Sequence, residues 1–245
     1  MHETALVVPA RLGSQRFPGK LLHPVRGRPL ILWTAENLSR IASGMPLYFA
    51  VAEAELAEVL GEKGYTCIRT DPGLASGTDR IAIANREIGA RRVINVQADE
   101  PVLSAGHLSQ LMQLMDGGMD AATLATPFAR IEDFQDPNKV KVVVSPKGEA
   151  LYFSRSPIPY DRDRRGGLPP DAWWHMGVYA YTDALLEAFL TWSPGRLEGI
   201  ERLEQLRIME NGQRIGVGLS EKRTVGVDVV DDLDQLEAFL KERED

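Results

Sequence analysis

Short apolar runs alternate with segments of helical periodicity through the first hundred residues of the chain. The runs predict strands that are buried on both faces, and the periodic segments predict helices that cross between them. We expect strands over residues 5–9, 47–52, 65–69 and 92–97, and helices over residues 31–41, 53–63 and 79–88. Strand, crossover helix and strand in alternation indicate a mostly parallel sheet with helices on both faces.

The pattern becomes richer in strand and turn signals after residue 120. Two β-rich runs within residues 140–155 flank a Pro-Lys-Gly turn and predict a hairpin, and residues 161–170 form a charged loop rich in Gly and Pro. Further strands are expected over residues 121–127, 174–181, 215–219 and 224–227, and further helices over residues 183–191, 198–211 and 231–243. We therefore predict a single α/β domain over residues 1–245, with a β-rich insertion at about 128–172.

Composition and charge argue against two classes of partner and indicate the compartment. The net charge of −7 argues against a nucleic-acid partner and against a site on an anionic membrane surface. The single cysteine excludes a disulfide framework and favours a reducing compartment. There is no basic leader, and no apolar run approaches the ~20 residues that a membrane span needs. The expected location is the cytoplasm.

The loop that follows the first strand carries three cations. Arg11, Arg16 and Lys20 lie among Gly13, Ser14, Pro18 and Gly19. Glycines free the backbone to wrap N–H groups around an anion, which the cations neutralise, so the loop indicates a polyphosphate site. Neither a Walker loop nor a G-x-G-x-x-G loop is present. From composition alone, a solvated basic loop fits equally well.

Two aspartates follow predicted strands and are candidate ligands of a magnesium ion. Asp99 comes after the fourth strand and Asp228 after a late strand. Mg²⁺ prefers one or two carboxylates, with phosphates and waters completing its shell. Either residue alone fits a helix cap equally well. The four histidines and the cysteine form no zinc-ligand spacing.

Eight short motifs follow one another over nearly the whole chain. They are VVPARLGSQRFPGKLL (7–22), ASGTDR (75–80), NVQADEP (95–101), PNKVKVVV (137–144), ALYFSRSPIPYDRD (150–163), HMGVYAY (175–181), LEGIERLEQLR (197–207) and GVD (226–228). In sequence and in order, these motifs resemble those of the 3-deoxy-manno-octulosonate (Kdo) cytidylyltransferase family.

The resemblance implies a Rossmann-like nucleotidyltransferase fold and a transfer of CMP from CTP to an acidic sugar, for lipopolysaccharide biosynthesis. It implies a homodimer built through the β-rich insertion, whose long apolar hairpin a lone domain would struggle to cover. By motif match, the nucleotide residues are Arg11, Arg16, Lys20, Ser76, Gly77, Thr78 and Gln97. The Mg²⁺ ligands are Asp99 and Asp228, and both act in catalysis with Arg11 and Lys20. The sugar residues are Arg155, His175, Tyr179, Glu204 and Gln205.

Some positions depart from the family's pattern and leave the identity of the acceptor open. Ala98 replaces a glycine, which is tolerable if its φ is negative and nothing packs against that face. Trp174 and Thr182 stand where arginine is common, and Val-Val follows Asp228 in place of Thr-Pro. If the two lost cations lined the sugar cavity, an 8-amino variant of Kdo would be favoured. A sialic-acid-like acceptor and a catalytically silent nucleotide-binding paralogue are two further hypotheses.

Overall fold

The computed structural model describes residues 2–14, 17–163, 167–221, 223–224, 226–227 and 229–242. The chain forms two compact units, Met1–Leu108 together with Thr224–Asp245, and Ser109–Arg223. We call them unit 1 and unit 2. Neither boundary coincides with an end of the insertion expected at about 128–172, and the single-domain description stays a prediction.

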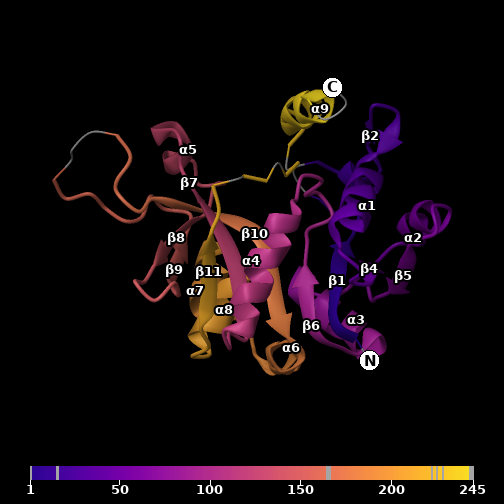
Figure 1. Ribbon diagram of the computed structural model, residues 1–245, viewed down its shortest axis with the longest axis horizontal. Helices are drawn as coiled ribbons and strands as arrows, with labels where there is room; N and C mark the ends of the chain where they lie inside the picture. The colour runs from indigo at the N-terminus through magenta and orange to yellow at the C-terminus, as the bar shows by residue number, and fades with distance from the viewer. Residues whose placement is uncertain are drawn as a thin grey trace. The chain divides into compact units, whose positions relative to one another are not determined.

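Unit 1 contains a parallel four-stranded sheet, as the alternating pattern predicts (Figure 1). Its order is β6 (Ala90–Asn95), β1 (His2–Ala10), β4 (Leu47–Val51) and β5 (Thr66–Arg69). Every adjacent pair of these strands is parallel. The last seven residues of β1 are buried, which matches its unbroken apolar run. Strand β6 ends at Asn95, two residues earlier than expected, so Gln97 lies in the loop that follows.

Four helices of unit 1 lie close to their expected ranges. They are α1 (Leu30–Ile41), α2 (Ala54–Gly61), α3 (Gly77–Ile88) and α9 (Asp232–Glu242). Helix α3 packs against β1, β4 and β6, and α2 packs against β4 and β5. Between β1 and α1 lie three short elements, η1 (Lys20–Leu22), β2 (Pro24–Val25) and β3 (Arg28–Pro29).

A hydrophobic cluster joins the first loop to the C-terminal helix. Phe17 of the loop packs with Leu30 of α1, with Leu236 of α9 and with Val227, which precedes the helix. These side chains are almost fully buried, so the cluster is a continuous part of the core. It brings the chain segment before Asp228 next to the loop that carries Lys20.

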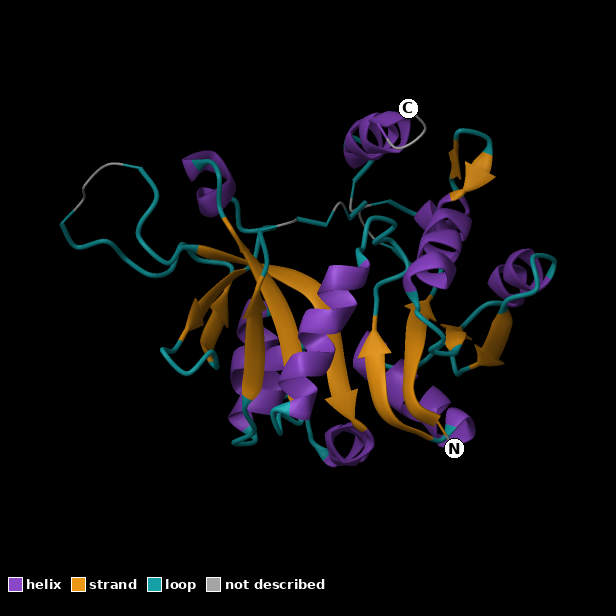
Figure 2. Ribbon diagram, in the orientation of Figure 1, coloured by secondary structure: helices purple, strands orange, loops and turns teal. Residues whose placement is uncertain are grey.

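Unit 2 contains a mixed sheet, which confirms the richer strand content expected after residue 120 (Figure 2). Its strands are β7 (Ala121–Pro127), β8 (Lys141–Val144), β9 (Ala150–Ser154), β10 (Trp173–Thr182) and β11 (Ile215–Leu219). Strand β7 is parallel to β11 and antiparallel to β10. The expected hairpin is β8–β9, and its turn is closed by the amide of Gly148, which donates to the carbonyl of Ser145 at 2.9 Å. Gly148 has a φ of 76°, a conformation that favours glycine.

Several expected elements of this part of the chain need correction. The helix expected over residues 198–211 is two helices, α7 (Arg196–Glu201) and α8 (Gln205–Glu210). The break falls at Arg202, whose φ of 55° is left-handed and therefore ends α7. The strand expected over residues 224–227 is absent, because the described residues 224, 226 and 227 form no strand.

Two helices were not expected, α4 (Ala105–Asp116) and α5 (Ile131–Gln135), while α6 (Asp183–Thr191) occupies its expected range. The part of α4 in unit 2 lies close to β11. A side chain at Gly218 would place its Cβ 2.8 Å from Leu124 and 3.5 Å from Leu114 of α4. A side chain at this position would therefore require the Leu124 side chain to shift.

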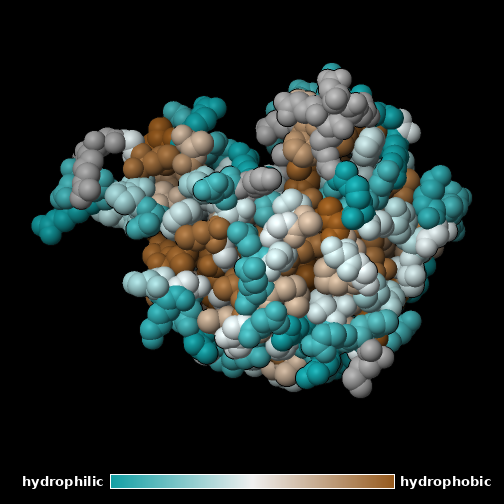
Figure 3. Space-filling model, in the orientation of Figure 1, coloured by the Kyte–Doolittle hydropathy of each residue, from teal (hydrophilic) through white to brown (hydrophobic). Residues whose placement is uncertain are grey.

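The surface carries few large apolar side chains. Hydrophilic residues cover much of the face in Figure 3, with hydrophobic residues in smaller patches. The exposed large hydrophobic residues are Leu151, Tyr160, Ile200, Leu219, Val229 and Val230. Within the described part of the chain, no helix is long and apolar enough to cross a membrane.

Candidate active site

Three segments that the sequence singled out for chemistry meet at Lys20 in unit 1. The Lys20 ammonium forms an ion pair with the Asp99 carboxylate and donates to the carbonyl of Val227 at 2.9 Å. The amide of Val227 donates in turn to the carbonyl of Asp99 at 3.0 Å. The structure therefore brings together the first loop, the loop after β6 and the residue that precedes Asp228.

The Lys20–Asp99 pair is partly buried, which suits it to binding a charged group. The Lys20 side chain is 11% exposed and that of Asp99 is 22% exposed, so the carboxylate remains reachable from solvent. An accessible Asp carboxylate has the oxygen chemistry that a divalent cation requires, and this one lies beside the loop whose cations predict a phosphate site. The donor set fits such an ion through Asp99. Asp228 lies outside the described residues, among which no group of three or more His, Cys, Asp or Glu side chains is arranged to hold a metal.

Gly19 and a hydrogen bond to the loop after β4 shape the first loop. Gly19 has a φ of 69° and precedes η1, so the chain turns sharply to bury Lys20. The amide of Leu12 donates to the Glu53 carboxylate at 3.1 Å, which anchors the start of the loop. Arg11 is exposed, and Arg16 lies outside the described residues.

The turn after β6 shows how the departure at Ala98 is accommodated. Ala98 is not among the described residues with a positive φ, so its backbone has no need of glycine. The residue is only 4% exposed, and its methyl group is therefore packed rather than facing open space. The Thr34 hydroxyl donates to the Ala98 carbonyl at 2.8 Å and holds the turn from α1, a role for Thr34 that the sequence did not suggest. Gln97 is half-buried beside it.

Ser76, Gly77 and Thr78 form the N-terminus of α3. Ser76 is the N-cap, and its hydroxyl accepts from the Asp79 amide at 3.1 Å and donates to the Asp79 carboxylate at 2.9 Å. Thr78 is buried. A Cβ at Gly77 would lie 3.7 Å from Pro9, an ordinary contact. Because the serine hydroxyl is committed to the cap, this segment offers its backbone N–H groups rather than that hydroxyl.

Arg80 is a buried cation of α3, and it was not among the residues predicted from the sequence to act in the site. Its guanidinium donates to the Thr70 hydroxyl and to the Asp71 carbonyl, the latter at 3.3 Å. Burial, and then the charge of Arg11, lower the pKa of Arg80. The positive charge of Arg11 opposes that of Arg80, while the carboxylates of Glu53 and Asp71 partly offset both effects by raising the pKa. The ASGTDR motif contained the signal, since Arg80 is its last residue.

Two of the expected sugar residues are brought together by an irregularity of β10. The register between β10 and β7 shifts between Met176 and Tyr179. The rings of His175 and Tyr179 lie 5.3 Å apart, and the His175 ring also contacts Phe153 at 5.0 Å. In a regular strand, residues four apart are separated by about 13 Å, so the bulge creates this cluster.

The polar groups of this cluster are neutral and partly unpartnered. Desolvation lowers the pKa of His175 from 6.5 to about 3, so its imidazole is neutral at physiological pH. Burial, with smaller contributions from Tyr181 and Glu204, raises the pKa of Tyr179 well above 10. Among the described residues, the Tyr179 hydroxyl of this cluster is buried without a hydrogen-bond partner, and so is the Nε2 of Gln205, which belongs to α8. Such orphaned groups are rare unless a ligand or water completes them.

Arg155 lies at the end of β9, where it is held by backbone carbonyls. Its Nε donates to the carbonyl of Glu201 at 2.7 Å, Nη1 to that of Pro137 at 3.0 Å, and Nη2 to that of Arg202 at 3.4 Å. The carboxylate of Glu201 in α7 also binds this segment, since it accepts from the Arg155 amide at 2.9 Å and from the Ser154 hydroxyl at 2.6 Å. At least three of the five guanidinium hydrogens are thus committed, which leaves at most two for a ligand.

The turn between α7 and α8 presents Glu204 and Gln205. Glu204 is the N-cap of α8, and Gln205 is its buried first residue. Behind the turn, Arg207 forms a two-pronged buried ion pair with Glu198, at 2.8 and 2.6 Å. Glu198 also accepts from the Gly195 amide at 2.8 Å, and the Arg207 guanidinium lies 4.3 Å over the Phe189 ring. The ion pair braces both short helices.

Trp174 and Thr182 are separate from the His175–Tyr179 cluster. Trp174 stacks on Phe128, with ring centroids 5.4 Å apart, and Arg223 lies 3.8 Å over its ring. Neighbouring residues of a strand point to opposite faces, which explains why Trp174 and His175 have different partners. Thr182 caps α6 by accepting from the Leu185 amide at 3.3 Å and donates to Asp120 at 3.2 Å. The observed contacts therefore do not support the idea that these two positions tune the sugar cavity.

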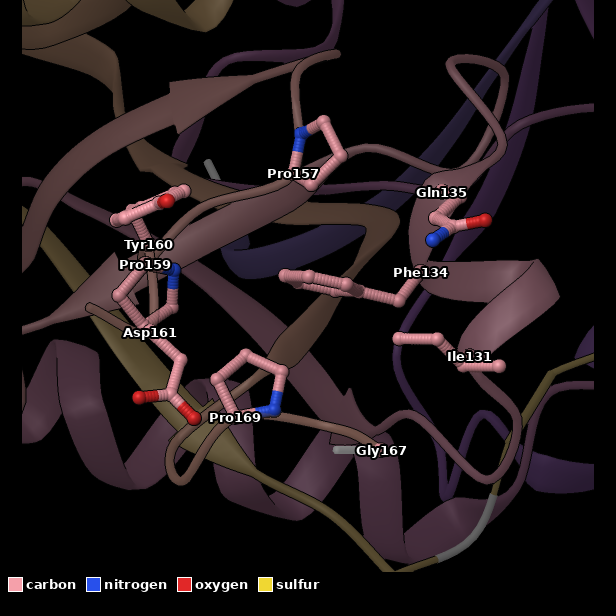
Figure 4. A pocket seen from close by; sticks show the side chains of 9 residues that line it. All are labelled: Ile131, Phe134, Gln135, Pro157, Pro159, Tyr160, Asp161, Gly167 and Pro169. Atoms are coloured by element: carbon pink, nitrogen blue, oxygen red, sulfur yellow. The ribbon is translucent and has the colours of Figure 1, made fainter. Parts of the chain in front are cut away.

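A separate cavity of about 360 Å³ opens in unit 2 between α5 and the segment after β9 (Figure 4). Ile131 and Phe134 of α5 line one side, and Pro157, Pro159 and Tyr160 line the other. None of the expected sugar residues contributes to its lining.

The chain is similar to known proteins over nearly its whole length. The family described as Cytidylyltransferase matches residues 5–215. A 3-deoxy-manno-octulosonate cytidylyltransferase of Anaeromyxobacter sp. (strain K) is 42% identical over 98% of both chains. One of Acidobacterium capsulatum is 40% identical over 97% of this chain and 96% of the relative.

Two solved structures are similar as well. A CMP:2-keto-3-deoxy-manno-octonic acid synthetase complexed with CTP has a TM-score of 0.89 and 32% identity, and covers 98% of this chain and 99% of that one. A putative glucose-1-phosphate thymidylyltransferase from Bacillus anthracis shares the fold alone, at a TM-score of 0.67 and 13% identity.

Proposed function

Because the chain belongs to the cytidylyltransferase family, we propose that it transfers CMP from CTP to the anomeric hydroxyl of Kdo, releasing pyrophosphate. The product would serve lipopolysaccharide biosynthesis. The observation that carries the proposal is the meeting of Lys20, Asp99 and Val227, which joins the three segments expected to act on a nucleotide's phosphates. The relatives that are about 40% identical over nearly the whole chain support Kdo as the acceptor.

CTP would be bound by unit 1. Arg11, Arg16 and Lys20 would neutralise its phosphates, and the N-terminal amides of α3 at Gly77 and Thr78 would add favourable dipoles. Ser76 would shape this end of the helix through its cap, with Gln97 near the nucleotide.

Asp99 and Asp228 would hold Mg²⁺, as the oxygen chemistry of Asp99 allows. When bound, the ion supplies charge neutralisation and lowers the pKa of a hydroxyl that it touches. Lys20 is held by Asp99 in the structure described here, and its ammonium would be available to balance charge on the departing pyrophosphate.

Kdo would be bound by unit 2. Arg155 would direct its remaining guanidinium hydrogens to the sugar carboxylate, and Glu204 would accept from sugar hydroxyls. Tyr179 and Gln205 would satisfy their buried polar atoms on the sugar. With a pKa of about 3, His175 cannot serve as a strong base at neutral pH, so its part is hydrogen bonding.

The reaction would be an in-line displacement: the anomeric hydroxyl loses its proton to solvent, its oxygen forms a bond to the α-phosphorus of CTP, and the bond to pyrophosphate breaks. Such transfers depend on positioning and charge neutralisation more than on covalent catalysis. The chain's residues would hold the two substrates and exclude competing acceptors.

Pyrophosphate release tests this function. The protein is incubated with Mg²⁺, one of the four ribonucleoside triphosphates, and either Kdo, 8-amino-Kdo or a sialic acid. We expect rapid release with CTP and Kdo, weak release with ATP and GTP because purines exceed a pyrimidine pocket, and slower release with 8-amino-Kdo. A preference for another sugar acid would replace Kdo as the acceptor, and no release with any pair would indicate a silent paralogue.

We propose in addition a homodimer formed through the β8–β9 region, in a cytoplasmic protein. Leu151 of β9 is 58% exposed and Tyr160, which follows the hairpin, is 72% exposed, as expected of an interface. Sedimentation at micromolar concentration should therefore give about twice the chain mass of 27.1 kDa, and the Leu151→Asp variant should shift toward the single-chain mass. A wild-type protein that sediments at 27.1 kDa would exclude this dimer.

A further inference from the structure

The hydroxyl of Thr123 occupies the β10 bulge that forms the His175–Tyr179 cluster. Thr123 lies in β7 and is fully buried. Its Oγ1 lies 2.8 Å from the carbonyl oxygen of Val178, 3.1 Å from that of Met176, and 3.1 Å from the His175 Nε2. Three polar atoms therefore converge on one side chain that no motif had singled out.

The hydrogen-bonding capacity of a hydroxyl assigns the roles of these atoms. Threonine has one hydrogen to donate and two lone pairs that accept. The two carbonyl oxygens can only accept, and donation to the Nε2 would leave both of them without a hydrogen, so donation to Val178 or Met176 is the more favourable arrangement. The contact with the His175 Nε2 is then favourable only if the imidazole donates. The hydrogen of the histidine accordingly resides on Nε2.

A neutral imidazole carries only one hydrogen, so its other nitrogen is an acceptor. His175 is neutral because its ring is desolvated between Phe153 and Tyr179. With Nε2 protonated, Nδ1 has a free lone pair. In the opposite tautomer, Nδ1 would be a donor. The lone pair of Nε2 would then face a lone pair of the Thr123 hydroxyl, which is repulsive.

We propose that Thr123 is a positioning residue that fixes His175 as the Nε2-protonated tautomer, so that Nδ1 accepts a hydrogen bond from a hydroxyl of the acceptor sugar. This inference rests on the proposed function of unit 2 as the sugar-binding part. In this arrangement His175 accepts a hydrogen bond from the sugar, and the Tyr179 hydroxyl donates one to it. A sugar that lacks the matching hydroxyl would lose this bond.

The test compares Thr123→Val, which removes the hydroxyl at nearly constant shape, with Thr123→Ser, which keeps it. Thr126→Val is the matched control, since Thr126 is a buried threonine of the same strand that pairs with Trp174 of β10. Two quantities are measured for each protein. Nitrogen-15 NMR of the imidazoles, with the His175 signals identified by their loss in His175→Gln, shows which nitrogen bears the hydrogen. Steady-state kinetics give the KM of Kdo and of CTP separately.

We expect the wild type, Thr123→Ser and Thr126→Val to carry the hydrogen on Nε2, and Thr123→Val to gain the Nδ1-protonated form. Loss of one oriented hydrogen bond should raise the Kdo KM of Thr123→Val about tenfold, with the CTP KM unchanged. A wild-type hydrogen on Nδ1 would overturn the inference even if Thr123→Val failed to fold. An unchanged Kdo KM in a folded Thr123→Val would overturn it too. Failure of the wild type to use any sugar acid would instead refute the proposed function, and the tautomer would still be measured.

Discussion

Asp99→Asn should lower kcat at least about a hundredfold while the protein stays folded, which corresponds to about 2.7 kcal/mol of lost transition-state stabilisation. The Asp99 carboxylate is the partner of the buried Lys20 ammonium and is reachable from solvent. A neutral amide is a poor ligand for a hard divalent cation and cannot offset the charge of Lys20. Turnover at saturating CTP and Kdo measures the loss, and circular dichroism checks the fold.

A matched control separates this effect from the mere removal of a negative charge. Glu62 is an exposed carboxylate of unit 1 that follows α2, so Glu62→Gln changes the net charge equally and should keep full activity. Asp228→Asn should behave like Asp99→Asn if both residues hold the ion. Near-normal turnover in Asp99→Asn would contradict the assignment of this carboxylate to the reaction.

Arg207→Met should lower the free energy of unfolding by about 3–5 kcal/mol. Arg207 is 5% exposed and binds Glu198 with two hydrogen bonds, while Glu198 is 11% exposed. Removing the guanidinium leaves a buried carboxylate with no opposite charge, although methionine fills much of the space. Urea unfolding of the variant and the wild type, followed by circular dichroism, measures the difference.

The control here is an exposed pair of the same kind. Arg91 is 71% exposed and lies 3.5 Å from Glu3, so Arg91→Met should cost less than about 1 kcal/mol. The double variant Glu198→Gln, Arg207→Met should recover part of the loss, because it no longer buries an unpaired charge. Equal losses in Arg207→Met and Arg91→Met would show that the buried pair does not brace α7 and α8.

Much of the architecture could be predicted from local pattern. The apolar run of β1 and the helical periodicity of α1 and α3 each depend on residues only a few positions apart, so these elements can be predicted from the sequence itself. The chemical segments were recognisable through the family's motifs taken together, because a solvated loop or a helix cap explains Lys20, Asp99 or Asp228 equally well when each is taken alone. Periodicity predicted one helix where α7 and α8 are separate. The break lies at Arg202, whose left-handed conformation has no signal in the local sequence.

What only the tertiary structure decided is the set of partners that each polar side chain meets. Lys20 and Val227 are 207 residues apart, and Thr123 and His175 are 52 apart, so neither contact leaves a trace in local periodicity. The bulge in β10 places His175 against Tyr179, and the alternation of the strand turns Trp174 to other partners. The sequence by itself determined most of the strands and helices and which residues carry charge. Packing between distant segments determined which of those charges and hydrogen bonds are combined, because desolvation makes each buried polar group depend on the partners that the fold supplies.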